Sequence, residues 1–133
     1  AYGIPVPEEL ARMVEKKKLG RKTGEGFYKW KNGKPIKEAS EGSVPVDLQD
    51  RLLLPMINES VAVLREGVVD DADLLDAGVI FGTGFAPFRG GPLNYARTRG
   101  LPDVLATLKM LEASHGDRFS ADDGWAMIEE DQT

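Results

Sequence analysis

The sequence predicts an all-α fold with one short β excursion near residues 26–34. Two observations carry this prediction: apolar side chains recur at helical spacing beyond residue 47, and an aromatic, strand-like run ends in an Asn-Gly pair. The 133 residues suffice for one domain, or for one domain and a fragment of another. About 41% of the residues are hydrophobic, which is enough for a real core at this length.

The first helix is predicted over residues 7–18. Pro7 suits a first turn, and the glutamates that follow it suit the positive end of a helix, as the lysine run near residue 18 suits the negative end. Gly20 is then predicted to end the helix. Residues 26–31 predict a strand, which the Asn32-Gly33 pair closes with a type I′ turn.

Residues 32–46 are predicted to be a linker, because they hold two Gly, two Pro and no helical period. A long helix is predicted from Asp47 to about Gly67, with Pro55 as a kink inside it. Either Asp70 or Asp71 can cap the next helix, residues 72–82.

Residues 83–92 are too rich in Gly and Pro to be regular, and Pro102 is predicted to open the following helix. The apolar side chains of that helix fall on one face: Leu101, Val104, Leu105, Leu108 and Leu111. Ser120 and Asp123 are spaced as in a capping box, with Asp in place of Glu, and predict a last helix through Trp125.

Composition excludes several function classes. The net charge of −5 argues against a general nucleic-acid binder, which needs a basic face. Without cysteine the chain has no disulfide and no thiolate chemistry. The absence of cysteine leaves the compartment open, with a lean to the cytoplasm. No apolar run is long enough to predict a membrane span, and no signal peptide opens the sequence. Because the chain begins with Ala1 instead of Met, we expect a piece of a longer protein.

Side chains that could act as catalysts or metal ligands are few. His115 is the only histidine and is predicted to be a surface residue at a helix end. Asp70, Asp71, Asp73 and Asp76 are interpreted as helix caps and a solvated face, since calcium loops need alternating ligands around a tight Gly turn. We therefore predict no catalytic residue and no metal site, and a hydrolase or lyase that works alone is disfavoured.

Two glycine-rich stretches leave alternatives open. GRKTGEGFYKWKNG, residues 20–33, has neither P-loop nor dinucleotide spacing, and it favours a helix end, a tight loop and a strand. Its exposed amides, with Arg21 and Lys22, could also meet a phosphate. GTGFAPFRGGPLNY, residues 82–95, is either a helix corner or the lip of an acyl- or nucleotide-binding groove, with Arg89 suited to phosphate or carboxylate.

The same two stretches carry a resemblance to a known family. GRKTGEGFYKW resembles the segment that closes the helical C-terminal domain of 3-hydroxyacyl-CoA dehydrogenases. The core of that domain is similar to DRLLLPMINESVAVLREGVVDDADLLDAGVIFGTGFAPFRGGPLNY, residues 50–95. In multifunctional fatty-acid-oxidation enzymes this domain occurs twice, after an enoyl-CoA hydratase domain and a Rossmann domain. The resemblance covers roughly residues 8–31 and 47–130 and implies a helical bundle of the 6-phosphogluconate dehydrogenase C-terminal type.

The order of the two motifs implies a domain organisation. Residues 1–31 would close the first helical domain, residues 32–46 would be a linker, and residues 47–133 would be the second helical domain. In single-function relatives two such domains pair across a dimer, and a tandem copy can imitate that contact. Six apolar residues are then candidates for the core or for packing on the first copy: Leu52, Met56, Val63, Leu64, Leu105 and Leu108.

The family resemblance also implies site residues. Lys22 stands where relatives contact NAD, and Phe81 stands where multifunctional relatives use a tyrosine to bind substrate. With Arg89, Phe81 forms the predicted substrate-binding set. Asp50 replaces the asparagine of the family's N-R-L-L-x-P-like run, which fits a second copy that has lost its chemical role.

The full enzyme of this resemblance oxidises 3-hydroxyacyl-CoA to 3-oxoacyl-CoA with NAD as cofactor. Its His–Glu pair and glycine fingerprint lie in the Rossmann domain and are absent from this sequence. The implied partners are that Rossmann domain, the first helical domain and an acyl-CoA substrate, with a thiolase subunit left open. The alternative hypothesis is a stand-alone helical module that binds a partner protein through residues 82–95.

Overall fold

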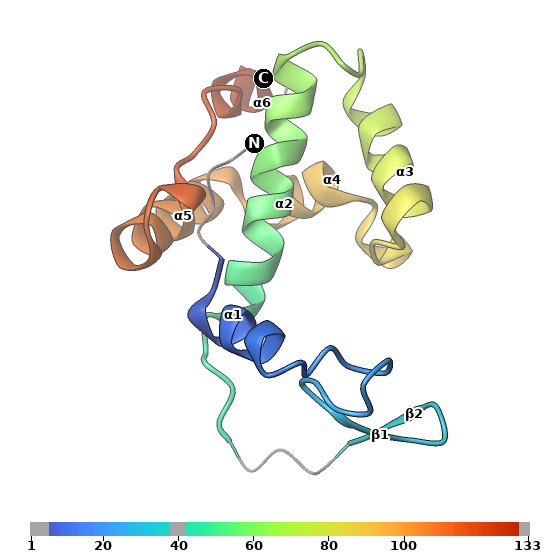
Figure 1. The fold of residues 1–133 in the computed structure, drawn as a ribbon. Helices are drawn as coiled ribbons and strands as arrows, with labels where there is room; N and C mark the ends of the chain where they lie inside the picture. Colours follow the sequence, from blue (N-terminus) through green and yellow to red (C-terminus); the bar gives the residue numbers. More distant parts are fainter. Residues whose placement is uncertain (1–5, 38–41, 131–133) are drawn as a thin grey trace. The chain divides into compact units, whose positions relative to one another are not determined.

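The computed structural model describes residues 6–37 and 42–130, and the chain divides into two compact units. Unit 1 comprises residues 1–43 and unit 2 residues 44–133. Unit 1 contains helix α1 (Glu8–Glu15) and an antiparallel hairpin of β1 (Lys29–Lys31) and β2 (Lys34–Ile36), seen in blue and cyan in Figure 1. Unit 2 is helical throughout its regular elements. The predicted all-α fold with a short β excursion is confirmed.

Helix α1 is shorter than residues 7–18 predict. Lys17 takes a left-handed conformation with φ 56°, and its amide donates to the Val14 carbonyl. The Lys18 amide donates to the Met13 carbonyl, which completes a Schellman motif. The helix therefore ends at Glu15, and the prediction that Gly20 ends it is wrong, because a lysine occupies the left-handed position that usually belongs to glycine.

The predicted turn at Asn32-Gly33 is confirmed. Both residues have positive φ, 52° and 74°, as a type I′ turn requires, and Lys31 pairs with Lys34 across it. Strand β2 lies inside the stretch predicted as a linker, because the turn returns the chain to pair with β1. Residues 38–41 of that stretch lie outside the described residues.

The loop between α1 and the hairpin is closed by its own contacts. The Gly20 amide donates to the Glu25 carbonyl at 2.8 Å, and the Leu19 amide donates to the Thr23 hydroxyl at 2.9 Å. A Cβ on Gly26 would lie 2.7 Å from the Gly20 Cα, so glycine at 26 permits this backbone crossing. Residues 20–26 therefore form a tight turn that is closed by its own hydrogen bonds and leads into the hairpin. This agrees with the prediction of a tight loop followed by a strand.

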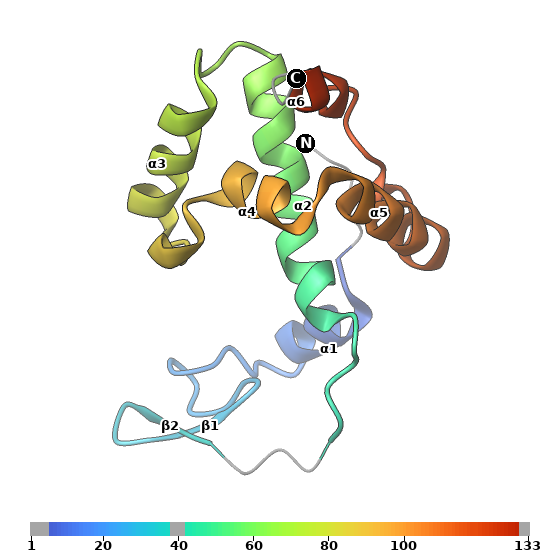
Figure 2. The ribbon, with the colours of Figure 1, turned by 180° about the vertical axis from the view of Figure 1, so that it is seen from behind.

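Helix α2 (Leu48–Arg65) is the centre of unit 2. It contacts α3 (Ala72–Thr83), α4 (Pro92–Arg99), α5 (Leu101–His115), η2 (Asp117–Phe119) and α6 (Trp125–Glu130). Figure 1 shows α3 on one side of α2 and α5 on the other, and Figure 2 shows α4 crossing α2. The residues that are fully buried around α2 include Leu54, Ile57, Val61, Leu93, Val104, Leu108, Phe119 and Ile128.

The first two helices of unit 2 lie close to their predicted positions. Pro55 is inside α2, and the Asp71 carboxylate caps α3 by accepting from the amides of Asp73 and Leu74 at 2.8 and 3.0 Å. Of the six apolar candidates for core or interface, Leu108 is fully buried whereas Leu52 is 67% exposed. Within the described part of the chain, no helix is long and apolar enough to cross a membrane.

Two predictions for the second half of unit 2 are wrong. The stretch after α3 contains a 3-10 turn, η1 (Pro87–Arg89), within residues 83–92, which were predicted to be irregular, and it is followed by the helix α4, which was not predicted. The capping box at Ser120 does not form either, because the Ser120 hydroxyl bonds to the Glu112 carboxylate. The Asp122 carboxylate instead accepts from the Gly124 amide at 2.7 Å, just before α6 begins.

Candidate functional site

A groove between η1 and α4 is the best candidate site in unit 2. Its volume is about 350 Å³, and its lining mixes aromatic, amide and cationic side chains: Phe88, Arg89, Asn94, Tyr95, Thr98 and Arg99. Helix α4 supplies four of these residues because positions 94, 95, 98 and 99 share one helical face. Such a combination suits a ligand with a negative group and a flat or apolar part.

Arg89 is the accessible cation of the groove. Its guanidinium carbon lies 5.5 Å from the centroid of the Phe88 ring and 5.6 Å from that of Tyr95, so the charge lies against two aromatic rings. No carboxylate among the described residues pairs with it, whereas its backbone carbonyl accepts from Asn94 Nδ2 at 2.9 Å. The guanidinium therefore remains open to an anionic ligand.

Arg99, in contrast, is held by its neighbours. Its Nη1 and Nη2 atoms donate to the two Asp50 oxygens at 2.5 and 3.2 Å, and Nε donates to Asp103 at 2.6 Å. Nη2 also donates to the Thr107 hydroxyl at 3.1 Å. The hydrogen bond to Asp50 is the largest cause that raises the pKa of Arg99 above its usual value. The Arg99 side chain is thus held in place at the edge of the groove, and its hydrogen bonds connect α4 to α2 and α5.

Replacing Asp50 with asparagine is expected to destabilise unit 2 by about 1–2 kcal/mol, since a half-buried, bidentate charged pair becomes a single hydrogen bond. Urea unfolding monitored by circular dichroism measures this loss. Asp103→Asn is the matched control: the Asp103 side chain is 62% exposed, and its loss should cost less than about 0.5 kcal/mol. Equal losses in the two variants would show that Asp50 has no special role.

Asp76 positions the start of α4. Its carboxylate accepts from the amides of Leu93 and Asn94 at 2.7 and 2.9 Å, so a side chain of α3 caps a helix 17 residues further on. Asp76 is only 4% exposed, which corrects the expectation of a solvated face at this position. Burial raises the pKa of Asp76, while the two backbone hydrogen bonds act in the opposite direction.

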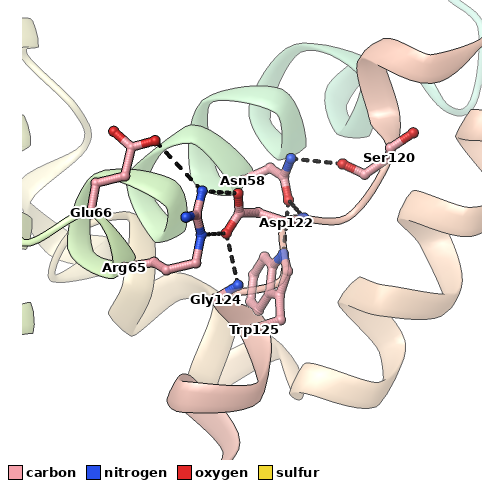
Figure 3. Close-up of polar contacts among 7 residues, drawn as sticks. All are labelled: Asn58, Arg65, Glu66, Ser120, Asp122, Gly124 and Trp125. Carbon is pink, nitrogen blue, oxygen red and sulfur yellow. Dashed lines mark hydrogen bonds and ion pairs between the residues drawn. The ribbon is translucent and has the colours of Figure 1, made fainter.

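A second polar cluster anchors the chain that leads to α6. Asn58 Oδ1 accepts from the Asp122 amide at 2.9 Å and from Trp125 Nε1 at 2.8 Å, and Asn58 Nδ2 donates to the Ser120 carbonyl at 2.9 Å (Figure 3). Arg65 forms a bidentate pair with Asp122 at 2.8 and 2.9 Å, and this contact lowers the pKa of Asp122. Because the side-chain amide of Asn58 and both carboxylate oxygens of Asp122 are engaged within the cluster, its role is structural.

The predicted site residues lie in different places. Arg89 lines the groove, and Phe81, in the last turn of α3, is 89% exposed and is not among the lining residues. Lys22 is exposed in the loop of unit 1, where several neighbouring amides are already bonded within the loop. Their roles stay predictions. His115 is the last residue of α5, as expected, with Nε2 3.2 Å from an Asp47 oxygen.

The four groove residues from α4 were not singled out from the sequence: Asn94, Tyr95, Thr98 and Arg99. The signal that could have found them is their spacing of one, four and five positions, which places them together once α4 is recognised as a helix. Within residues 6–37 and 42–130, no three His, Asp or Glu side chains are placed to hold a metal ion.

Comparison with known proteins gives a consistent set of relatives. The chain is 36% identical, over 89% of its length, to the fatty acid oxidation complex subunit alpha of Vibrio cholerae. It is 38% identical over 74% of its length to the protein of the same name from Colwellia psychrerythraea, and 34% identical over 86% to that from Shewanella loihica. The chain spans only 16–18% of these relatives. No family model matches it.

Proposed function

Because this chain is a homologue of the C-terminal part of fatty acid oxidation complex alpha subunits, we propose that it is a non-catalytic segment of a multifunctional β-oxidation enzyme. The full enzyme would oxidise 3-hydroxyacyl-CoA to 3-oxoacyl-CoA with NAD, would carry enoyl-CoA hydratase activity, and would work in the cytoplasm. Unit 2 would pack on the first helical domain and the Rossmann domain and shape the acyl-CoA cleft, with or without a thiolase subunit beside it. Unit 1 would be the end of the first helical domain.

The Asp50–Arg99 pair is the observation that carries the non-catalytic role. Asp50 stands where the family resemblance implies a neutral asparagine, and both of its oxygens are engaged by one guanidinium. A carboxylate held in this way does not supply the amide donor of asparagine, and its charge is already neutralised by Arg99. His115, the single histidine of the chain, bonds to Asp47 near the surface and is not among the residues that line the groove between η1 and α4.

Three side chains are proposed to contact ligands of the full enzyme, and each offers a different kind of contact. Arg89 fits an anionic part of an acyl-CoA, because its guanidinium has no acidic partner in the described chain. Phe81 offers an exposed ring for acyl packing without the hydroxyl of a tyrosine. Lys22 would meet a phosphate of NAD through its ammonium group, since the amides of Leu19, Gly20 and Thr23 donate inside the loop.

A spectrophotometric NADH assay with acetoacetyl-CoA tests the proposal. We expect no turnover by the chain alone, because it supplies neither a His–Glu pair nor a dinucleotide fold. A separately produced dehydrogenase portion of a relative should bind the chain in size-exclusion chromatography. Turnover by the chain alone contradicts the non-catalytic role.

The alternative is a stand-alone module that binds a partner protein. It is favoured by the exposure of large apolar side chains on α3 and η1, where Leu74, Phe81 and Phe88 are 64%, 89% and 84% exposed. The same binding experiment separates the two hypotheses. A stand-alone module would not bind the dehydrogenase portion in size-exclusion chromatography. The variant Phe81→Ser would not bind it either.

A further inference from the structure

The charge of the chain is distributed very unevenly. Residues 1–43 carry ten Lys and Arg and six Glu, whereas residues 44–133 carry seven Lys and Arg and sixteen Asp and Glu. The overall charge of −5 therefore combines a net charge of +4 in unit 1 with a net charge of −9 in unit 2. A local excess of one sign in a small unit attracts ligands of the opposite sign, and the attraction weakens with ionic strength.

The hairpin gathers part of this charge on one face. In β1 and β2 the residues Lys29, Lys31 and Lys34 are exposed, and they alternate with the half-buried Trp30 and Pro35. The register places Lys31 directly opposite Lys34, so that their Cβ atoms are about 5 Å apart. We call these three lysines the lysine face.

Among residues 6–37 and 42–130, no ion pair involves a lysine of the lysine face. In residues 6–37 the ion pairs are Arg12–Glu9 and Lys18–Glu25, both at 2.8 Å. Glu25 also interacts with Lys29, yet the larger causes that lower its pKa are the hydrogen bond and the charge of Lys18. Lys31 and Lys34 have no carboxylate partner in the described chain.

Such an arrangement is unfavourable without an anion. Like charges directly opposite each other destabilise a pair of strands, and a two-stranded hairpin is marginal by itself. An anion seated between the ammonium groups removes the repulsion, so that anion binding and hairpin stability become linked. Lysine suits phosphate here because its ammonium group is a mobile point charge that does not require bidentate geometry.

An aromatic ring lies next to this face in the sequence. Phe27, two residues before β1, is 74% exposed, although a phenylalanine side chain is normally buried. We propose that the lysine face binds the clustered phosphates of a soluble nucleotide, with the Phe27 ring as a stacking surface for its base. This inference uses side chains other than Lys22, Phe81 and Arg89, and it does not depend on the proposed function.

Isothermal titration calorimetry of the whole chain with inorganic triphosphate tests the lysine face. We expect saturable binding that weakens with added NaCl, and a loss of about tenfold or more in affinity for K31Q/K34Q. The matched control, K16Q/K17Q, removes the same charge from the end of α1 and should change the affinity less than about twofold. Equal losses in both variants, or no binding by the original chain at low salt, would overturn the proposal.

The nature of the ligand is tested by three further titrations. ATP should bind more tightly than inorganic triphosphate, and Phe27→Ala should remove that difference. Equal affinities for the two ligands in the original chain would refute the stacking role. Vesicles of phosphatidylserine with phosphatidylcholine distinguish the other source of clustered phosphates: binding to vesicles without binding to ATP or triphosphate would overturn the proposal of a soluble ligand.

Folding of the variants is checked by two-dimensional NMR. Neutralising Lys31 and Lys34 should preserve the cross-strand contacts of the hairpin, because it relieves repulsion. Triphosphate should slow amide exchange in residues 29–36 of the original chain and leave the exchange of K31Q/K34Q unchanged. An equal slowing in both proteins would contradict binding at the lysine face.

Discussion

Replacing Asp76 with alanine is expected to destabilise unit 2 by about 2–4 kcal/mol, since two backbone amides at the start of α4 lose their acceptor inside the protein. Leu93 is fully buried, so water cannot replace the carboxylate without opening the helix. Gly91 adds to the constraint, because a Cβ at that position would lie 2.3 Å from the Asp76 Cβ. Urea unfolding measures the loss.

Two variants sharpen this experiment. Asp73→Ala removes an exposed carboxylate from the same helix and should cost less than about 1 kcal/mol. Asp76→Asn keeps the shape and one acceptor oxygen, and its loss should be intermediate. An Asp76→Ala loss no larger than that of Asp73→Ala would show that α4 does not need this cap.

Asp76 also gives the stability a pH dependence with a definite sign. Burial raises the pKa of Asp76 in the folded state above its ordinary value of 3.8, so the folded protein holds the proton over a range where the unfolded chain has released it. The free energy of unfolding should therefore fall as pH rises from about 3.8 through the folded pKa. Asp76→Asn should lack this part of the pH profile.

Replacing Asn58 with alanine is expected to cost about 2–3 kcal/mol and to release the segment that leads to α6. The amide side chain makes three hydrogen bonds to that segment (Figure 3), and without it the Asp122 amide and the buried Trp125 indole N–H would lose their acceptor. The loss should be visible both in urea unfolding and as a red shift of Trp125 fluorescence.

The matched control for Asn58 is Asn94→Ala. Asn94 is exposed and its side chain makes one hydrogen bond, to the Arg89 carbonyl, so its loss should cost less than about 1 kcal/mol. If Asn58→Ala leaves Trp125 fluorescence and stability unchanged, water replaces the amide and the cluster does not anchor α6.

The sequence was most informative where a structural signal is local. Asp71 caps the helix that follows it, and Asn32-Gly33 closes the hairpin, so both features are encoded within a few residues. Helix α4 was missed because its capping carboxylate, Asp76, lies 17 and 18 positions before the amides that it binds. Its eight residues also bury few apolar side chains, chiefly Leu93 and Ala96.

The candidate site followed the same pattern. Arg89 was recognised because it lies in a conspicuous glycine-rich stretch, whereas Tyr95 and Arg99 depended on the helix that was not predicted. The pairing of Arg99 with Asp50 joins positions 49 residues apart, which no local pattern reveals. The lysine face was hidden for another reason: a net charge taken over the whole chain averages a basic unit with an acidic one.

The contact between Asp76 and the amides of Leu93 and Asn94 has a consequence for how this protein can diversify. Together with the close approach of Gly91 to Asp76, it fixes the start of α4 against α3 through hydrogen bonds that do not involve residues 84–88. Insertions or deletions between Gly84 and Phe88 can therefore be absorbed without displacing the helical framework. Because Phe88 and Arg89 end that connection and line the groove, homologues with connections of different length would share one scaffold and differ in ligand preference.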